Sequence, residues 1–168
     1  MRRDGIGQGA LLLDNAQAAL DEILAGLGRQ RFYACTATGT AAAANAGIVE
    51  VKNPAASGKV LYFFMGDLWV ATAMKVTVVF DGTTTNPAGV PSPMYDGGGA
   101  SVATFGGTNQ NAPTGAAWIT SPSLAINTPY LLPAWFWAAL PAGKNLQLQG
   151  GTVNQAFTAN LRWVELTT

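Results

Sequence analysis

From residue 32 onward the chain consists of short apolar or alternating runs, each closed by turn-forming residues. Asn53-Pro54, Asp81-Gly82 and Gly150-Gly151 are typical of these closures, because such residues favour turns. Many short strands without intervening helices indicate an antiparallel β-sandwich of the mainly β class, jelly-roll-like in form. The expected strands are residues 32–38, 48–52, 60–65, 68–71, 74–80, 102–105, 118–120, 130–132, 135–140, 146–148 and 157–166.

The last expected strand has the clearest pattern. Its apolar residues alternate with polar ones, which places them on one face of a strand. Val164 and Leu166 interrupt the polar face, so we expect the end of this strand to be covered by a loop or by another subunit. The predicted core residues here are Phe157, Ala159, Leu161 and Trp163.

Residues 82–115 are mostly Gly, Pro, Thr, Asn and Ser. This composition predicts long surface loops with at most one short strand.

The first 31 residues differ from the rest, since they hold eight of the 18 charged side chains. Asp14 is placed to cap a helix from Asn15 to about Leu27, with apolar residues at helical spacing. The sequence therefore predicts a helical arm at 1–31 and a β domain at 32–168. The helix either packs on its own domain or docks on a neighbouring chain.

Charge and composition argue against several classes of function. The formal net charge is zero, which removes the basic footprint of a nucleic-acid binder. The chain has no histidine, so histidine acid–base chemistry and histidine metal sites are excluded. Its one cysteine, Cys35, lies in an alternating run and is expected to be a buried core residue. We expect no catalytic residue, no metal site and no cofactor.

Carboxylates are the remaining option for acid–base chemistry. Asp67, Asp81 and Asp96 lie in turns or beside glycine, and Glu50 and Glu165 lie in expected strands. No spacing among them implies a facing pair, so a small hydrolase using Asp or Glu is a remote alternative. The most apolar stretch, 130–140, is shorter than the roughly 20 residues that a membrane helix needs, and no membrane partner is expected.

Aromatic residues concentrate in this same stretch. Neighbouring residues of a strand point to opposite faces, so its three consecutive aromatics cannot all enter one core. The second face is covered by another subunit or by the chain itself, or else it stacks on sugars. The residues expected at an oligomer interface are Tyr130, Leu131, Trp135, Phe136 and Trp137.

Two parts of the chain are similar to small virion proteins of tailed bacteriophages. Residues 53–62, NPAASGKVLY, resemble an NPxxSGKxLY segment of these proteins. The C-terminal half resembles them in LPAG at 140–143 and in FTANLRWVE at 157–165. The resemblance covers about 49–62 and 130–166.

This resemblance implies a jelly-roll sandwich that forms a homotrimer on the virion, assembled in the host cytoplasm. The function it favours is a capsid decoration (cement) protein that bridges and stabilises major capsid subunits. The alternative is a tail- or fibre-associated protein that binds host glycans through the 82–115 loops. In the first case the N-terminal segment is expected to dock on the major capsid protein or another virion protein, through Leu20, Ile23, Leu24, Leu27, Arg29 and Arg31.

Overall fold

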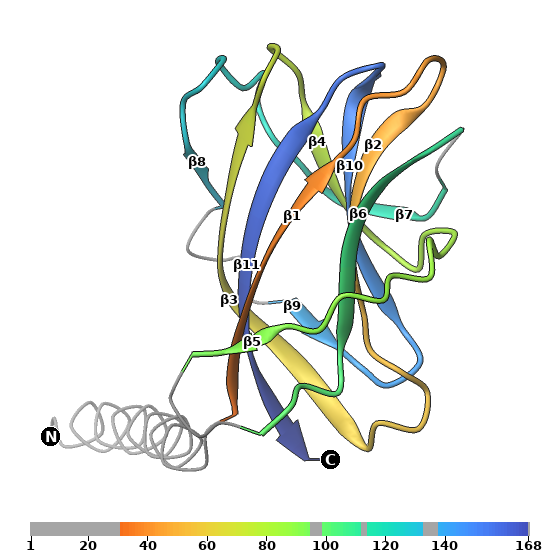
Figure 1. The fold of residues 1–168 in the computed structure, drawn as a ribbon, viewed down its shortest axis with the longest axis vertical. Helices are drawn as coiled ribbons and strands as arrows, with labels where there is room; N and C mark the ends of the chain where they lie inside the picture. The colour runs from red at the N-terminus through yellow and green to blue at the C-terminus, as the bar shows by residue number, and fades with distance from the viewer. Residues whose placement is uncertain (1–30, 95–98, 112–113, 133–137, 168) are drawn as a thin grey trace, which may run out of the picture.

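The computed structural model describes residues 31–94, 99–111, 114–132 and 138–167. Two antiparallel sheets pack face to face, as Figure 1 shows. The first sheet has the order β5-β1-β11-β3-β8, with β9 also paired to β3, and the second has the order β6-β2-β10-β4-β7. The prediction of a mainly β protein built as a sandwich is therefore confirmed.

The strands follow the predicted runs closely over most of the chain. Their bounds are β1 (Phe32–Gly39), β2 (Ala46–Lys52), β3 (Lys59–Val70), β4 (Val76–Phe80), β5 (Ser92–Pro93), β6 (Thr104–Gln110), β7 (Ala116–Thr120), β8 (Tyr130–Leu131), β9 (Ala138–Leu140), β10 (Asn145–Val153) and β11 (Phe157–Thr167).

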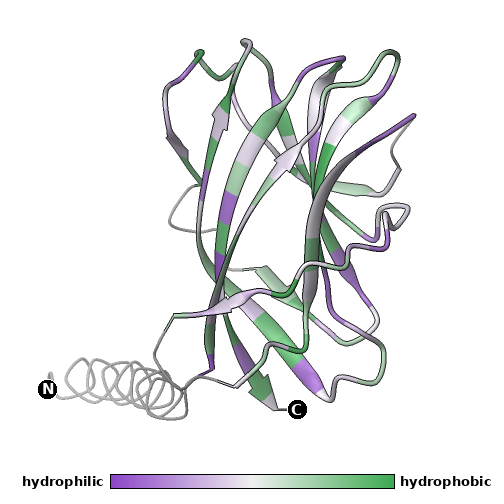
Figure 2. Cartoon of the chain, in the orientation of Figure 1, coloured by the Kyte–Doolittle hydropathy of each residue, from purple (hydrophilic) through white to green (hydrophobic). Residues whose placement is uncertain are grey.

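The core lies between the two sheets and is centred on Trp163 of β11. The Trp163 ring is fully buried, with its centroid 5.5 Å from that of Phe63 and 6.3 Å from that of Tyr33. The apolar set predicted for this strand is buried, and polar and apolar residues alternate along the strands in Figure 2. Cys35 is also buried, as expected.

The end of β11 departs from simple alternation because of a β-bulge. The register with β3 shifts between Arg162 and Trp163, and Trp163, Val164 and Glu165 are all buried in succession. A bulge allows adjacent residues to point toward protein. The backbone N–H of Val102 donates to the Glu165 carboxylate, so a loop of the same chain covers this end.

The prediction of separate strands at 60–65 and 68–71 is wrong, because β3 runs through both as one strand. Gly66, which follows the first predicted strand, lies in the middle of β3. A Cβ on Gly66 would lie 2.6 Å from the Leu132 side chain and 3.0 Å from that of Leu161. Close packing around this position thus favours glycine without ending the strand.

The prediction for residues 82–115 is also wrong in part. The segment contains β5 and the seven-residue strand β6, which pairs with β2 along its whole length and begins two residues later than predicted. Gly107 lies where β6 meets β1, and a Cβ there would lie 2.0 Å from the carbonyl oxygen of Thr38. Beside it, the Thr40 N–H donates to the Thr108 carbonyl at 2.9 Å. Gly107 in β6 is therefore explained by the close approach of two strands. From its composition alone, this glycine-containing segment resembled a loop.

Candidate functional site

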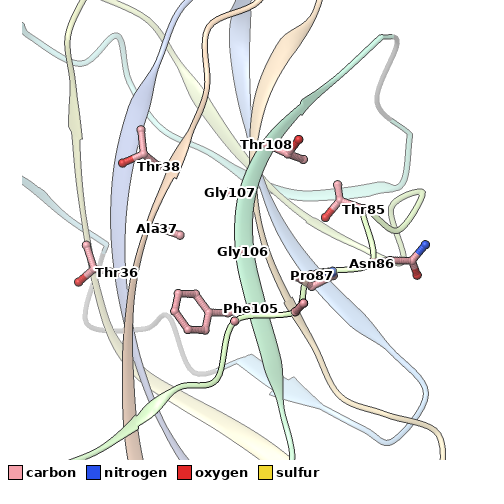
Figure 3. Close-up of a pocket in the computed structure, with 12 residues that line it drawn as sticks. Thr36, Ala37, Thr38, Thr85, Asn86, Pro87, Phe105, Gly106, Gly107 and Thr108 are labelled. Carbon is pink, nitrogen blue, oxygen red and sulfur yellow. The ribbon is translucent and has the colours of Figure 1, made fainter.

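A groove of about 450 Å³ opens between β1 and β6, below the point where these strands meet. Figure 3 shows Ala37 of β1 directed toward the groove, Thr36 and Thr38 on the far side of that strand, the 85–87 segment beyond β6, and the Phe105 ring between the two strands. Small and polar side chains surround the groove, and Gly106 forms part of β6 there. The groove is a candidate site within the 82–115 segment in which sequence reasoning placed recognition.

Glu50, on β2, is completely buried and organises one of the walls of this region. Its carboxylate accepts hydrogen bonds from the Thr84 hydroxyl at 2.7 Å and from both the N–H and the hydroxyl of Thr85 at 2.6 Å. The amide nitrogens of Asn145 and Gln147, on β10, donate at 3.0 and 3.2 Å. Since a buried carboxylate is stable only when its oxygens are paired, Glu50 and the 84–85 segment hold each other in place.

Glu165 plays the same part on the other sheet. It is also completely buried, and it accepts hydrogen bonds from the Ser101 hydroxyl and the Val102 N–H. The Lys59 ammonium lies 3.1 Å from its second oxygen, and the Trp163 indole N–H donates at 3.5 Å. The carboxylate thus ties the 101–102 loop to β3 and β11.

A third polar centre forms at Asn53, after β2. Its side-chain amide nitrogen donates to the backbone carbonyls of Lys59 at 2.8 Å and Leu140 at 2.9 Å, while its backbone carbonyl accepts from the Gly143 N–H at 2.9 Å. The segments 53–62 and 140–143 therefore meet at one side chain. Lys59 extends this corner to Glu165 on β11.

The outer face of the first sheet carries ordered rows of side chains. Trp69 lies beside Thr158, which lies beside Thr38, on three adjacent strands. The next row is Asp67, Asn160 and Thr36. Within the first row, Thr38 and Thr158 share a hydrogen bond at 2.9 Å. Within the second row, Thr36 donates to Asn160 at 2.5 Å and Asn160 donates to Asp67 at 2.9 Å. Trp69 is 38% exposed, so this polar face includes an accessible aromatic ring.

The predicted interface residues are placed only in part. Tyr130 and Leu131 form β8, at the edge of the first sheet, where Tyr130 packs against the core and Leu131 is 69% exposed. Trp135, Phe136 and Trp137 lie outside the described residues.

The predicted helix at 15–27 and the docking residues Leu20, Ile23, Leu24, Leu27 and Arg29 also lie outside the described residues. Arg31 is described, and its carbonyl accepts from the Glu165 N–H at 3.0 Å.

The candidate carboxylates of a hydrolase are held separately. Asn160 donates to Asp67, and Lys144 pairs with the exposed Asp81 at 2.8 Å. Asp96 lies outside the described residues. Glu50 and Glu165 anchor loops on different sheets, a role that sequence reasoning missed. The available signal was a glutamate set directly between Val49 and Val51, in a strand buried on both faces.

In the described part of the chain, no three acidic or thiol side chains gather as they would around a metal ion. Among those same residues, no helix has the length and apolar character needed to cross a membrane.

Burial raises the pKa of the Cys35 thiol from its ordinary value of 9.0 to about 12, although a hydrogen bond with the Leu161 backbone acts in the opposite direction. The folded state therefore disfavours the thiolate. The contribution of the buried neutral thiol to the free energy of unfolding is fully present below pH 9.0 and is lost as the pH rises toward 12.

We expect the free energy of unfolding to fall above pH 9.0, with the thiol contributing a slope of at most about 1.4 kcal/mol per pH unit. Urea titrations at several alkaline pH values measure this slope. The Tyr33 pKa is also raised, by burial and then by Glu165, so Cys35→Ala is the control that isolates the thiol. Equal slopes for the parent and Cys35→Ala proteins would contradict the prediction.

Comparison with protein-family models, with curated proteins and with solved structures finds no match for this chain.

Proposed function

We propose that this chain is a bacteriophage virion structural protein with a jelly-roll fold, which forms a homotrimer and decorates the capsid. In this role it bridges major capsid subunits and stabilises the shell. In this role the protein functions by contacting neighbouring virion proteins, and we assign it no catalytic residue and no cofactor.

The observation that carries the proposal is the β8 edge of the first sheet. Among the described strands β8 pairs with β3 alone, and Leu131 has 69% of its surface exposed there. A large exposed apolar side chain at a sheet edge favours association with another chain. The predicted interface at 130–137 begins at this edge.

The Asn53 corner supports the family resemblance behind the proposal. Three segments that resemble phage virion proteins are separated in sequence but share the contacts of Asn53, Lys59 and Glu165. Three sequence motifs that contact one another in the fold are stronger support for a resemblance than three turns that lie apart. The sandwich and its pinned loops also suit a rigid building block.

Leu131→Asp is expected to convert the oligomer to a monomer, because it places a charge in the apolar contact. Light scattering would then report a mass near 17.4 kDa for the variant and about three times that for the parent. Val90→Asp is the matched control, since Val90 is 66% exposed and lies in a loop away from β8. A Leu131→Asp protein that keeps the parent's mass would refute the interface.

The position on the particle needs a separate measurement. Electron microscopy of intact particles is expected to locate the protein across the capsid lattice. Density confined to the tail or fibres would instead support the tail-associated alternative.

A further inference from the structure

The outer face of the first sheet combines an exposed ring with hydrogen-bonding groups on neighbouring strands. Trp69 lies at one end of a row with Thr158 and Thr38. The two threonine hydroxyls share a single hydrogen bond, at 2.9 Å, in which either oxygen can be the donor. One hydroxyl hydrogen of the pair is therefore left for a ligand, together with free acceptor lone pairs.

The adjacent row adds an amide and a carboxylate. Asn160 accepts from Thr36 and donates to one oxygen of Asp67. These contacts orient the Asp67 side chain while leaving its other oxygen able to accept hydrogen bonds. Arg162 lies one row further along the face and donates to Met65. Among the described residues of these rows, the charged groups are the Asp67 carboxylate and the Arg162 guanidinium, which have opposite signs.

A hollow of about 220 Å³ lies beside the Trp69 ring, at the end of the first row. Thr38, Thr158 and Asn127 contribute polar groups to its lining, and Ala71 and Ala156 keep it open with small side chains. Sites for drug-sized ligands occupy about 300–1,000 Å³. This smaller hollow suits a single ring lying against the indole.

We propose that Trp69 and its neighbouring polar rows bind a neutral saccharide, with one sugar ring stacked on the indole. An apolar sugar face pairs with the aromatic ring, while sugar hydroxyls both donate and accept, as the threonine and amide groups require. Asp67 accepts from such hydroxyls and repels anionic sugars. The site is distinct from the 82–115 loops in which the sequence placed glycan recognition. It does not depend on the proposed position of the protein on a virion.

The test uses the full chain labelled with 5-fluorotryptophan, in which each of the five tryptophans gives its own fluorine resonance, assigned by single Trp→Phe variants. The probes are the β1,4-linked tetramers of glucose and of N-acetylglucosamine. We expect at least one probe to shift the Trp69 resonance with a Kd of about 0.1–1 mM, the range for a site that contacts one ring. Trp118 is the internal control, because it is 41% exposed on the other sheet and its resonance is expected to stay in place.

Variants then separate the stacking from the polar contacts. Trp69→Ala lacks the reporter ring, so its affinity for the same probes is measured by isothermal titration calorimetry beside the parent. We expect binding to be weaker by at least about tenfold, as is usual when an aromatic anchor is removed. Thr158→Val keeps the shape of the side chain, and Asp67→Asn keeps its size; each is expected to weaken binding measurably. The masses of the same samples by light scattering report the oligomeric state, so a failure here is distinguishable from a failure of the proposed trimer. Unchanged Trp69 resonances with both probes, or equal shifts at Trp69 and Trp118, would overturn the proposal.

Discussion

Glu50→Ala is expected to lower the free energy of unfolding by about 3–5 kcal/mol, the range for removing one partner from a buried charged network. The carboxylate is completely buried and accepts five hydrogen bonds. Truncation leaves the Asn145 and Gln147 amides without this partner inside the protein. It also releases Thr84 and Thr85, so the 84–85 segment is expected to lose its fixed position.

Urea unfolding at one fixed protomer concentration measures the effect, since association also changes apparent stability. Asp81→Asn is the matched control: it removes a carboxylate whose ion pair with Lys144 is half exposed, and asparagine tolerates the positive φ of this position. The control is expected to cost less than about 1 kcal/mol. A Glu50→Ala protein as stable as Asp81→Asn would show that the network does not hold the fold together.

Hydrogen exchange provides a second, local measurement. The Thr85 amide hydrogen is expected to exchange slowly in the parent, because it is bonded to the Glu50 carboxylate. In Glu50→Ala its protection should disappear even under conditions in which the sandwich remains folded.

Trp163→Ala is expected to destabilise the protein by about 3–5 kcal/mol, as is typical when a large buried aromatic is truncated. The ring is fully buried between Phe63 and Tyr33, and its indole N–H reaches Glu165. Removing it leaves a cavity at the centre of the core and takes one donor from the buried Glu165 carboxylate.

Trp163→Phe is the informative second variant, because it retains most of the apolar volume but lacks the indole N–H. We expect it to cost less than half as much as Trp163→Ala. Chemical denaturation followed by circular dichroism would give both values. Equal losses for the two variants would mean that packing volume at this position contributes little.

The alternation of polar and apolar residues was sufficient to predict the strands that have one face toward the core. The four apolar residues of β11 are buried because a period of two matches the pleat. The same pattern could not reveal the bulge after Arg162, which depends on pairing with β3. Gly66 and Gly107 were misleading for a related reason: each is a glycine because another part of the chain approaches it closely.

The candidate sites were harder to predict than the strands. Glu50 and Glu165 were recognised as strand residues, but their hydrogen-bond donors come from segments 34 and 64 residues away. Only the fold brings these groups together. The Trp69 surface has the same origin, because its polar groups belong to three strands whose order in the sheet differs from their order in the sequence.

The close approach at Gly107 has a consequence for assembly. Gly89 exchanges two hydrogen bonds with Phe105 on the outer edge of β6, and Thr40 bonds to Thr108 further along that edge. Among the described residues, the β1 and β6 side of the sandwich is therefore largely closed to further strands, whereas β8 on the opposite side pairs with β3 alone. Growth of a filament by strand pairing needs an open edge on both sides of each protomer, so the closed β1 and β6 side disfavours it.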